Sequence, residues 1–233
     1  MDRMNTSTIG NLIGTGLYTP TEVARLTGVS TSKIVRWFRG HHTAQRNCEA
    51  LWTPSICTDD GKLYLSFRDL TEIRVADAFI GKGLSPQKVR RAIELAQREH
   101  GETRPLSSAR FKTDGRTIFL QVVNEEGDGD KDQLLDLFKS QLAFKKIIEP
   151  SLKDIDFNES APFRWWIAGR EKHILLDPER SFGRPIEDKS SVPTSVLANA
   201  YLAEGSFASA ARAYDVSVLS VRRSVEFEQR LAA

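Results

Sequence analysis

Apolar residues near the N-terminus recur at helical spacing on both sides of a short polar break. Thr19 and the proline after it precede the first apolar positions, which is typical of a helix start. The break at 28–30 (Gly-Val-Ser) begins with a glycine, the residue that most easily adopts the backbone of a tight turn. The pattern therefore predicts a short helix, a tight turn and a second helix over 31–39.

The same arrangement recurs near the C-terminus. Apolar positions predict a helix over 194–204, and Gly205 separates it from an alanine-rich helix that ends near Tyr214. A polar turn at 215–217 (Asp-Val-Ser) precedes a third helix that begins at Val218. Three short helices with a tight turn before the last are typical of homeodomain-like helix-turn-helix units.

The pattern between these two regions predicts two β-hairpins, because Asp-Gly between apolar runs favours a tight turn between strands. The first joins 51–53 to 63–65, and the second joins 109–112 to 117–123 through Asp114 and Gly115. Other elements follow from capping residues and apolar spacing. They are a helix after the near capping box of Ser66 and Asp69, a helix from Pro86 to about His100, an amphipathic helix over 133–148 ended by Glu149-Pro150, and short strands at 162–167 and 172–176.

Composition indicates an ordinary soluble protein with a formal net charge of +2 over 233 residues. No apolar run is long enough to span a bilayer, and the first ten residues do not have the pattern of a secretory signal. The two cysteines, Cys48 and Cys57, make no disulfide framework, which favours a cytoplasmic protein. Basic residues gather between 17 and 46 and acidic residues between 125 and 136, a separation that suits a basic DNA-binding face and an acidic connector.

The N-terminal region resembles the winged helix-turn-helix of the MerR family over roughly 17–101. The order helix, turn, helix, hairpin, helix, helix carries this resemblance. So do four sequence segments: 18–30 (Tyr-Thr-Pro-Thr-Glu-Val-Ala-Arg-Leu-Thr-Gly-Val-Ser), 35–38 (Val-Arg-Trp-Phe), 65–70 (Leu-Ser-Phe-Arg-Asp-Leu) and 83–86 (Gly-Leu-Ser-Pro).

The C-terminal region resembles a widespread bacterial family of VapB-like antitoxins over about 174–229. Five motifs occur in order: 176–178 (Leu-Asp-Pro), 182–185 (Phe-Gly-Arg-Pro), 192–194 (Val-Pro-Thr), 202–205 (Leu-Ala-Glu-Gly) and 221–227 (Val-Arg-Arg-Ser-Val-Glu-Phe). Such antitoxins usually accompany a PIN-domain ribonuclease toxin. The resemblance implies that the protein inhibits a toxin of this kind and binds its own operator.

We therefore expect a mainly α protein with small β-hairpins, divided into four parts. They are a flexible tail (1–16), a MerR-like winged helix-turn-helix (17–101), a connector made of a hairpin and an amphipathic helix (102–173), and a homeodomain-like antitoxin domain (174–233). A homodimer is expected as well, because one such module makes few base contacts and operators are usually palindromic.

Candidate DNA contacts lie on or just before the helix that follows each tight turn, which is the second helix of the N-terminal unit and the third of the C-terminal unit, and on the predicted wing. They are Thr31, Ser32, Lys33, Arg36, Arg39 and Lys62 in the N-terminal unit, and Ser217, Ser220, Arg222 and Arg223 in the C-terminal unit. The N-terminal set is the better candidate, because the C-terminal helix face could be merely solvated or serve in dimerisation or toxin docking.

Candidate toxin contacts combine arginine and aromatic residues, which are favoured as interface anchors. They are Arg164, Trp165, Trp166, Arg170, Arg180, Phe182 and Arg184. Core packing is the competing explanation for the two tryptophans, and it is the one to be preferred for such residues.

No catalytic signature is present: the chain has no nucleophile elbow, phosphate-binding loop with Lys-Ser/Thr, or His-Glu-x-x-His motif. His41, His42, Cys48 and Cys57 do not have the usual spacing of zinc ligands, so we expect no metal and no cofactor. The sequence thus favours an antitoxin that is not an enzyme. The alternative is a stand-alone MerR-like transcription regulator.

Overall fold

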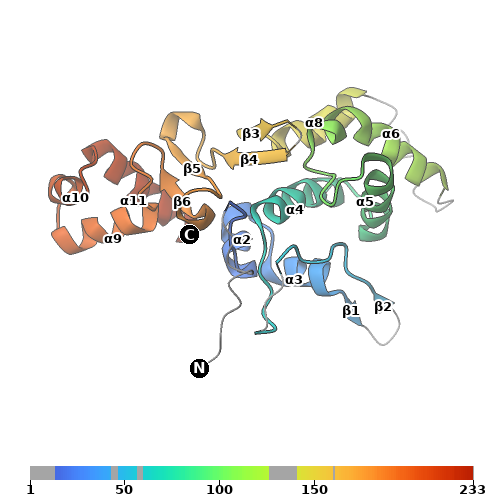
Figure 1. Cartoon of the computed structure of the whole chain (residues 1–233), viewed down its shortest axis with the longest axis horizontal. Helices are drawn as coiled ribbons and strands as arrows, with labels where there is room; N and C mark the ends of the chain where they lie inside the picture. Colours follow the sequence, from blue (N-terminus) through green and yellow to red (C-terminus); the bar gives the residue numbers. More distant parts are fainter. Residues whose placement is uncertain (1–13, 43–46, 57–59, 126–140, 160, 233) are drawn as a thin grey trace. The chain divides into compact units, whose positions relative to one another are not determined.

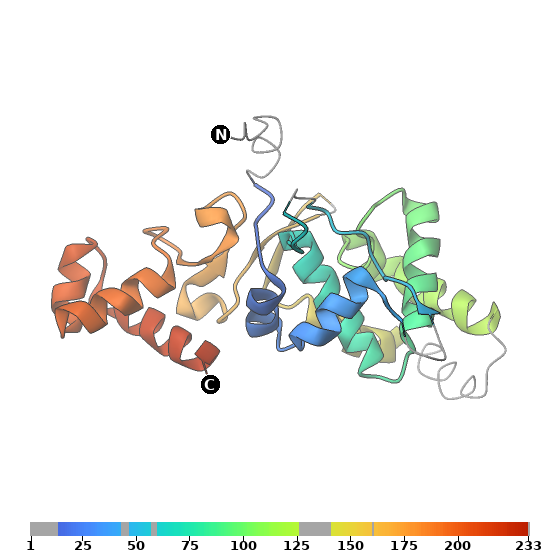
Figure 2. The ribbon, with the colours of Figure 1, turned by 90° about the horizontal axis from the view of Figure 1, so that it is seen from below.

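The computed structural model describes residues 14–42, 47–56, 60–125, 141–159 and 161–232. Those residues form a mostly helical protein with a small four-stranded sheet (Figures 1 and 2). The chain divides into two compact units, one made of residues 19–153 and 157–162 and the other of residues 1–18, 154–156 and 163–233. The mainly α expectation is confirmed. The predicted connector, 102–173, is shared between the two units.

The first unit contains helices and one small β ladder. In chain order its elements are α2 (Pro20–Thr27), α3 (Thr31–Arg39), β1 (His41–His42), β2 (Asn47–Cys48), α4 (Phe67–Ile80), α5 (Pro86–His100), α6 (Ala109–Glu125) and α8 (Gln141–Ser151). Helix α4 contacts α2, α5 and α8, and α6 contacts both α5 and α8. Helix α4 is therefore the element around which the unit is organised.

Local signals explain where several of these helices begin. Thr19 accepts a hydrogen bond from the backbone of Glu22, whose carboxylate reaches back to Thr19, so both residues form a capping box. Ser66 and Asp69 form a second capping box at the start of α4. Gly28, with a φ of 78°, ends α2 in the left-handed conformation that a tight turn requires.

Four phenylalanines fill the core of the first unit: Phe79, Phe111, Phe119 and Phe144. The closest pair, Phe79 and Phe119, has ring centroids 4.4 Å apart. They come from α4, α6 and α8, so their packing holds these three helices together. Residues 102–125 and 141–153 are thus part of the core of this unit.

The predicted hairpin at 109–123 is wrong, because this segment is the single helix α6. Buried Phe111, Ile118, Phe119 and Val122 recur at helical spacing and face the core. At Gly115 an added Cβ would meet the ring of Phe111 at 2.9 Å, so the glycine provides room for the ring and does not form a turn. Tertiary packing here overrides the local Asp-Gly signal.

The other predicted hairpin differs in register. Tyr64 makes an isolated antiparallel bridge with Ile56, and the expected strand at 51–53 does not form. Instead the backbone amides of Leu51 and Trp52 donate to the carbonyl of Trp37, and both side chains are buried. The ring of Trp52 packs on Trp37 and Phe38, which draws this segment onto the end of α3.

The helix predicted over 133–148 is observed as α8 from Gln141, and residues 126–140 lie outside the described part of the chain. The helix includes Pro150, which we expected to end it, and continues to Ser151. The predicted acidic connector at 125–136 and the predicted tail at 1–16 lie almost entirely outside the described residues.

The second unit contains most of the sheet and the C-terminal helices. Its elements, with the strands β3 and β4 that reach into the first unit, are β3 (Ile155–Asn158), β4 (Ala161–Trp165), η1 (Arg170–Lys172), β5 (Ile174–Leu176), η2 (Ser181–Gly183), β6 (Pro185–Glu187), α9 (Thr194–Glu204), α10 (Phe207–Ala213) and α11 (Val218–Ala232). The strand order is β3-β4-β5-β6, and β5 is antiparallel to both β4 and β6.

The three C-terminal helices pack on one another around a small apolar core (Figure 1). Leu197 of α9, Ala210 of α10 and Val221 of α11 are fully buried in it. Tyr201 and Phe207 stack at its edge with ring centroids 4.1 Å apart. Helix α9 also contacts β6, so the three-helix group continues into the sheet.

Candidate functional site

The start of α3 presents polar side chains to solvent. Ser32 and Arg36 are exposed, while Ile34, Trp37 and Phe38 of the same helix are buried. The guanidinium of Arg36 donates to the carbonyl of Ser32 at 3.3 Å, which uses one of its donors and leaves its charge at the surface.

Two other basic side chains of α3 already have partners. The ammonium of Lys33 lies 2.6 Å from the carboxylate of Asp77 in α4 and 5.1 Å from the ring centre of Trp37. Arg39 donates to the carbonyl of Gly61 at 2.8 Å and so holds the neighbouring loop beside α3. Lys62 on this loop is exposed, 3.7 Å from Asp60. Arg36 and Lys62 therefore carry the more accessible charges.

A buried ion pair, between Arg104 and Asp69, supports the segment that follows Trp52. Arg104 donates to Asp69 at 2.6 Å, to the carbonyl of Thr53 at 2.6 Å and to Ser55 at 2.9 Å. The Asp69 side chain is fully buried and that of Arg104 is 7% exposed. Asp69 also accepts from Ser66, so one carboxylate fixes both the start of α4 and the segment after Trp52.

A second buried carboxyl lies one helical turn further along α4. Glu72 is fully buried, and the backbone and hydroxyl of Ser107 donate to one of its oxygens at 2.7 and 2.8 Å. Its other oxygen has no hydrogen-bond partner among the described residues. Burial disfavours the charged form more than Ser107 and nearby Arg104 and Arg68 favour it, and the pKa of Glu72 rises to about 7.

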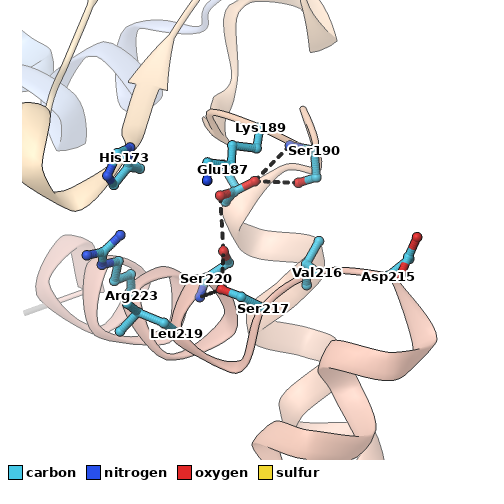
Figure 3. Close-up of a pocket in the computed structure, with 10 residues that line it drawn as sticks. All are labelled: His173, Glu187, Lys189, Ser190, Asp215, Val216, Ser217, Leu219, Ser220 and Arg223. Atoms are coloured by element: carbon cyan, nitrogen blue, oxygen red, sulfur yellow. Dashed lines mark hydrogen bonds between the residues drawn. The ribbon is translucent and has the colours of Figure 1, made fainter.

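The start of α11 is organised differently from that of α3. It borders a cavity of about 440 Å³ lined by His173, Glu187, Lys189, Ser190, Asp215, Val216, Ser217, Leu219, Ser220 and Arg223 (Figure 3). Glu187 lies at the centre of a hydrogen-bond network in this cavity. Its carboxylate accepts from the backbone and hydroxyl of Ser190 at 2.8 and 2.7 Å and from the hydroxyl of Ser220 at 3.0 Å.

In this network the serine hydroxyls of the cavity donate to other residues of the same cavity. Because Ser220 gives its proton to Glu187, the 2.8 Å contact between Ser217 and Ser220 requires Ser217 to be the donor. Burial opposes ionisation of Glu187, but the hydrogen bonds from Ser190 and Ser220 outweigh it, so the pKa of Glu187 lies below its usual value. The arrangement locks the start of α11 to the turn after β6, and it offers no free serine donor to an incoming anion.

Of the remaining C-terminal candidates for DNA contact, Arg223 lines this cavity and Arg222 lies beside an apolar side chain. Arg222 is exposed but lies over the ring of Phe207, 4.9 Å from its centre. Val218 and Leu219, the first two residues of α11, are 44% and 50% exposed. The start of this helix is therefore apolar where the start of α3 is polar.

The candidate toxin contacts divide into buried and exposed residues. Trp165 is 5% exposed and belongs to the core of the sheet. Trp166 donates its indole N–H to Asp156 at 2.9 Å, and Arg170 pairs with the same carboxylate. Burial opposes ionisation of Asp156, but these two donors lower its pKa overall.

Arg164 and Arg180 share a buried acidic partner, Asp177. Their guanidinium groups lie 3.2 and 2.9 Å from its carboxylate. In contrast, Phe182 is 63% exposed, and the exposed side chain of Arg184 makes no hydrogen bond or ion pair with the described residues. Asp177 and Glu187 were not among the sequence candidates, although both belong to or adjoin the motifs of the C-terminal resemblance. The sequence around a single acidic residue does not indicate which side chains its carboxylate will contact in the folded protein.

Among the described residues no group of three or more His, Cys, Asp or Glu side chains could hold a metal ion. His41 pairs with Cys48 across β1 and β2, and Cys57 is outside the described part of the chain. No helix in the described ranges is both long enough and apolar enough to cross a membrane.

No family model matches the chain. It is 26% identical over 223 residues to a Mycobacterium tuberculosis (strain ATCC 25618 / H37Rv) protein named "Putative antitoxin VapB45", and the alignment covers 90% of this chain and 92% of that protein. This similarity supports kinship with VapB-like antitoxins. The fold is similar to the X-ray crystal structure of Rv2018 from the same species, with a TM-score of 0.67 and 22% identity over 89% of this chain and 96% of that one.

Proposed function

We propose that this protein is the antitoxin of a type II toxin-antitoxin system, which binds and inhibits a PIN-domain ribonuclease and represses its own operon. The observation that carries the proposal is the similarity to a named antitoxin along nearly the whole of both chains. The activity requires binding surfaces and no catalytic centre, so we assign no cofactor and no metal. The protein would act in the cytoplasm, where its toxin and its operator are found.

For operator binding we favour a winged helix-turn-helix built on α2 and α3. The polar start of α3, with Thr31, Ser32, Lys33, Arg36 and Arg39, would meet the major groove, and Lys62 would reach the backbone from the wing. The exposure of Ser32, Arg36 and Lys62 supports this choice. Lys33 would have to exchange Asp77 for a phosphate, which makes it a weaker contact.

A second, weaker set of DNA contacts is Arg222 and Arg223 in the homeodomain-like unit, joined by the exposed Ser217 only if its hydroxyl exchanges Ser220 for a phosphate. We leave Ser220 out of the proposed set, because it is buried and its hydroxyl donates to Glu187. The protein would bind as a homodimer, since two modules related by a twofold axis match a palindromic operator.

For toxin binding we favour Phe182 and Arg184, with Arg164, Trp166, Arg170 and Arg180 around them. Trp165 is left out, because its ring packs inside the sheet. The side chains of Phe182 and Arg184 differ from the others because they make no hydrogen bond or ion pair with the described residues. Residues of these types are frequent interface hot spots.

The decisive experiment is to co-express the tagged protein with the reading frame next to its gene and to purify the complex. The partner's cleavage of RNA is then measured with and without this protein. A stable complex in which cleavage is suppressed would support the proposal. Tight binding to its own promoter, without any complex or inhibition, would contradict it and favour the stand-alone regulator.

A further inference from the structure

The loop between β5 and β6 holds three successive residues in the left-handed region. The φ values are 48° at Ser181, 55° at Phe182 and 80° at Gly183. Glycine adopts this conformation without cost, but a side chain with a Cβ does not. A bulky aromatic residue such as Phe182 is an outlier there, and such backbone strain persists only where the surroundings impose it.

Hydrogen bonds from Leu17 and Tyr18 to the backbone of this loop help to impose the conformation. The carbonyl of Phe182 accepts from the backbone of Leu17 at 3.1 Å, and the carbonyl of Gly183 accepts from the hydroxyl of Tyr18 at 2.7 Å. At Gly183 an added Cβ would collide with that hydroxyl, so only glycine fits against Tyr18.

Arg180 anchors the other side of the loop. Its guanidinium donates to Asp177 at 2.9 Å, to the carbonyl of Asp188 at 2.8 Å and to Ser191 at 3.2 Å. The hydroxyl of Ser181 adds a bond to the carbonyl of Ser191 at 3.3 Å. The loop is thus rigid, and its rigidity does not depend on the ring of Phe182.

The ring itself is directed to solvent, with 63% of the residue exposed, so it contributes little to the fold. Two costs therefore meet at one residue: a strained backbone and an exposed large apolar side chain. Arg184, two residues further along, is exposed and makes no ion pair with the described residues. Neither the strained backbone nor the exposed side chain of Phe182 stabilises the fold of this unit.

We propose that Phe182 is a preorganised anchor that inserts into an apolar socket on the toxin, with Arg184 pairing with a carboxylate at the rim of that socket. This inference rests on the proposed function, and it names the residue that would carry the binding energy. A rigid aromatic side chain that is already in place loses little conformational freedom on binding, which raises affinity.

A second copy of this chain is a poorer occupant for the ring. The cavity beside α11 is lined mainly by polar and charged groups, including Lys189 and Arg223, and the cavity on α5 is lined by Arg91, Glu94, Gln97 and Arg98. Neither of these two cavities offers an apolar socket for the ring of Phe182. A partner with carboxylates at its rim fits the charge of this loop better.

The test uses the full chain and the purified protein encoded by the adjacent reading frame. Dissociation constants are measured for the unsubstituted chain and for Phe182→Ala, Phe182→Gly, Arg184→Ala and Leu202→Ala. Leu202 is a matched control, since it is also a large apolar residue, 76% exposed, but lies in the regular helix α9. Melting temperature and binding to promoter DNA are recorded for each variant.

We expect both Phe182 variants to bind the toxin at least tenfold more weakly, Arg184→Ala to bind several-fold more weakly, and Leu202→Ala to bind within twofold of the original. Phe182→Gly should melt no lower than the unsubstituted protein, because glycine relieves the strain at this position. All variants should bind promoter DNA equally well.

Toxin binding that survives both Phe182 substitutions would overturn this proposal and leave the antitoxin function intact. A large fall in melting temperature for Phe182→Gly would overturn it too, by showing that the ring supports the fold. So would a dimer of this chain that dissociates on substitution of Phe182. Failure of the unsubstituted chain to bind the toxin would overturn the antitoxin function and this inference with it.

Discussion

The second helix of each of the two helix pairs, α2–α3 and α10–α11, follows a tight polar turn, but the side chains at its start differ. Helix α3 begins with Thr31, Ser32 and Lys33, and its exposed Arg36 lies one turn further on. Helix α11 begins with Val218 and Leu219, both about half exposed. The same local pattern of helix, turn and helix therefore supports two different surfaces, one polar and basic and the other apolar.

The two units also hold their buried carboxylates differently. Glu72 in the first unit has one oxygen without a partner and a raised pKa, because burial dominates. Glu187 in the second unit accepts three hydrogen bonds, and its pKa is lowered. The comparison shows that the direction of the pKa shift depends on the balance between burial and the hydrogen-bond donors placed around the carboxylate.

The largest expected effect comes from breaking the first unit alone. Arg104→Ala leaves the fully buried Asp69 without its cation, and loss of one partner of a buried ion pair costs about 3–5 kcal/mol. Hydrogen exchange under native conditions should show a loss of protection of this order in α4 and little change in α11. Arg98→Ala, on an exposed part of α5, is the control. Equal losses in α4 and α11 would contradict the division into two units.

The next effect is an opposite response of the two units to pH. The folded pKa of Glu72, about 7, exceeds its ordinary value of 4.5, so the folded state binds the proton more tightly than the unfolded state. Its contribution to stability is complete below pH 4.5 and is lost as pH rises to 7, by about 3 kcal/mol.

For Glu187 the folded pKa lies below 4.5, so its contribution is present above that pH and is lost as the pH falls through the folded pKa. Amide exchange in α4 and in α11, measured from well below pH 4.5 up to pH 8 and corrected for intrinsic rates, should reveal both trends. Glu72→Gln should remove the trend in α4 and leave that in α11. An unchanged slope in α4 after this substitution would show that another group causes it.

A smaller effect concerns one exposed arginine in each helix pair, Arg36 in α3 and Arg222 in α11. Arg36→Ala should weaken binding to the protein's own promoter by about 1–3 kcal/mol, as expected for an arginine that contacts a base or a phosphate. Arg222→Ala should change it less than twofold, because this guanidinium lies over Phe207. Fluorescence anisotropy at fixed salt measures both. The reverse order would assign operator binding to the C-terminal unit.

The smallest effect distinguishes the serines near the starts of the two helices. Ser220→Ala removes a hydrogen bond to Glu187 and should cost about 1 kcal/mol of unfolding free energy. Ser32→Ala changes an exposed side chain and should stay within about 0.5 kcal/mol of the original. Urea denaturation measures both variants. Equal costs would mean that the lock between α11 and the turn after β6 adds no stability.

The sequence by itself determined the elements whose signals are local. Capping residues and apolar spacing correctly predicted α2, α3, α4 and α5 and the three C-terminal helices, because a cap and an amphipathic face act within one or two turns of the chain. The segment around Gly115 failed for the complementary reason. Its Asp-Gly pair favours a turn, and only the packing of Phe111 against α4 and α8 makes it helical.

Tertiary structure alone decided which candidate residues remain accessible. The sequence placed Ser217, Ser220, Arg180, Phe182 and Arg184 in the candidate sets on equal terms. The fold then ties Ser220 to Glu187 and Arg180 to Asp177, and it leaves Phe182 and Arg184 at the surface. Partners of this kind lie up to 33 residues away along the chain, and the free energy of such contacts depends on distances that only the folded backbone sets.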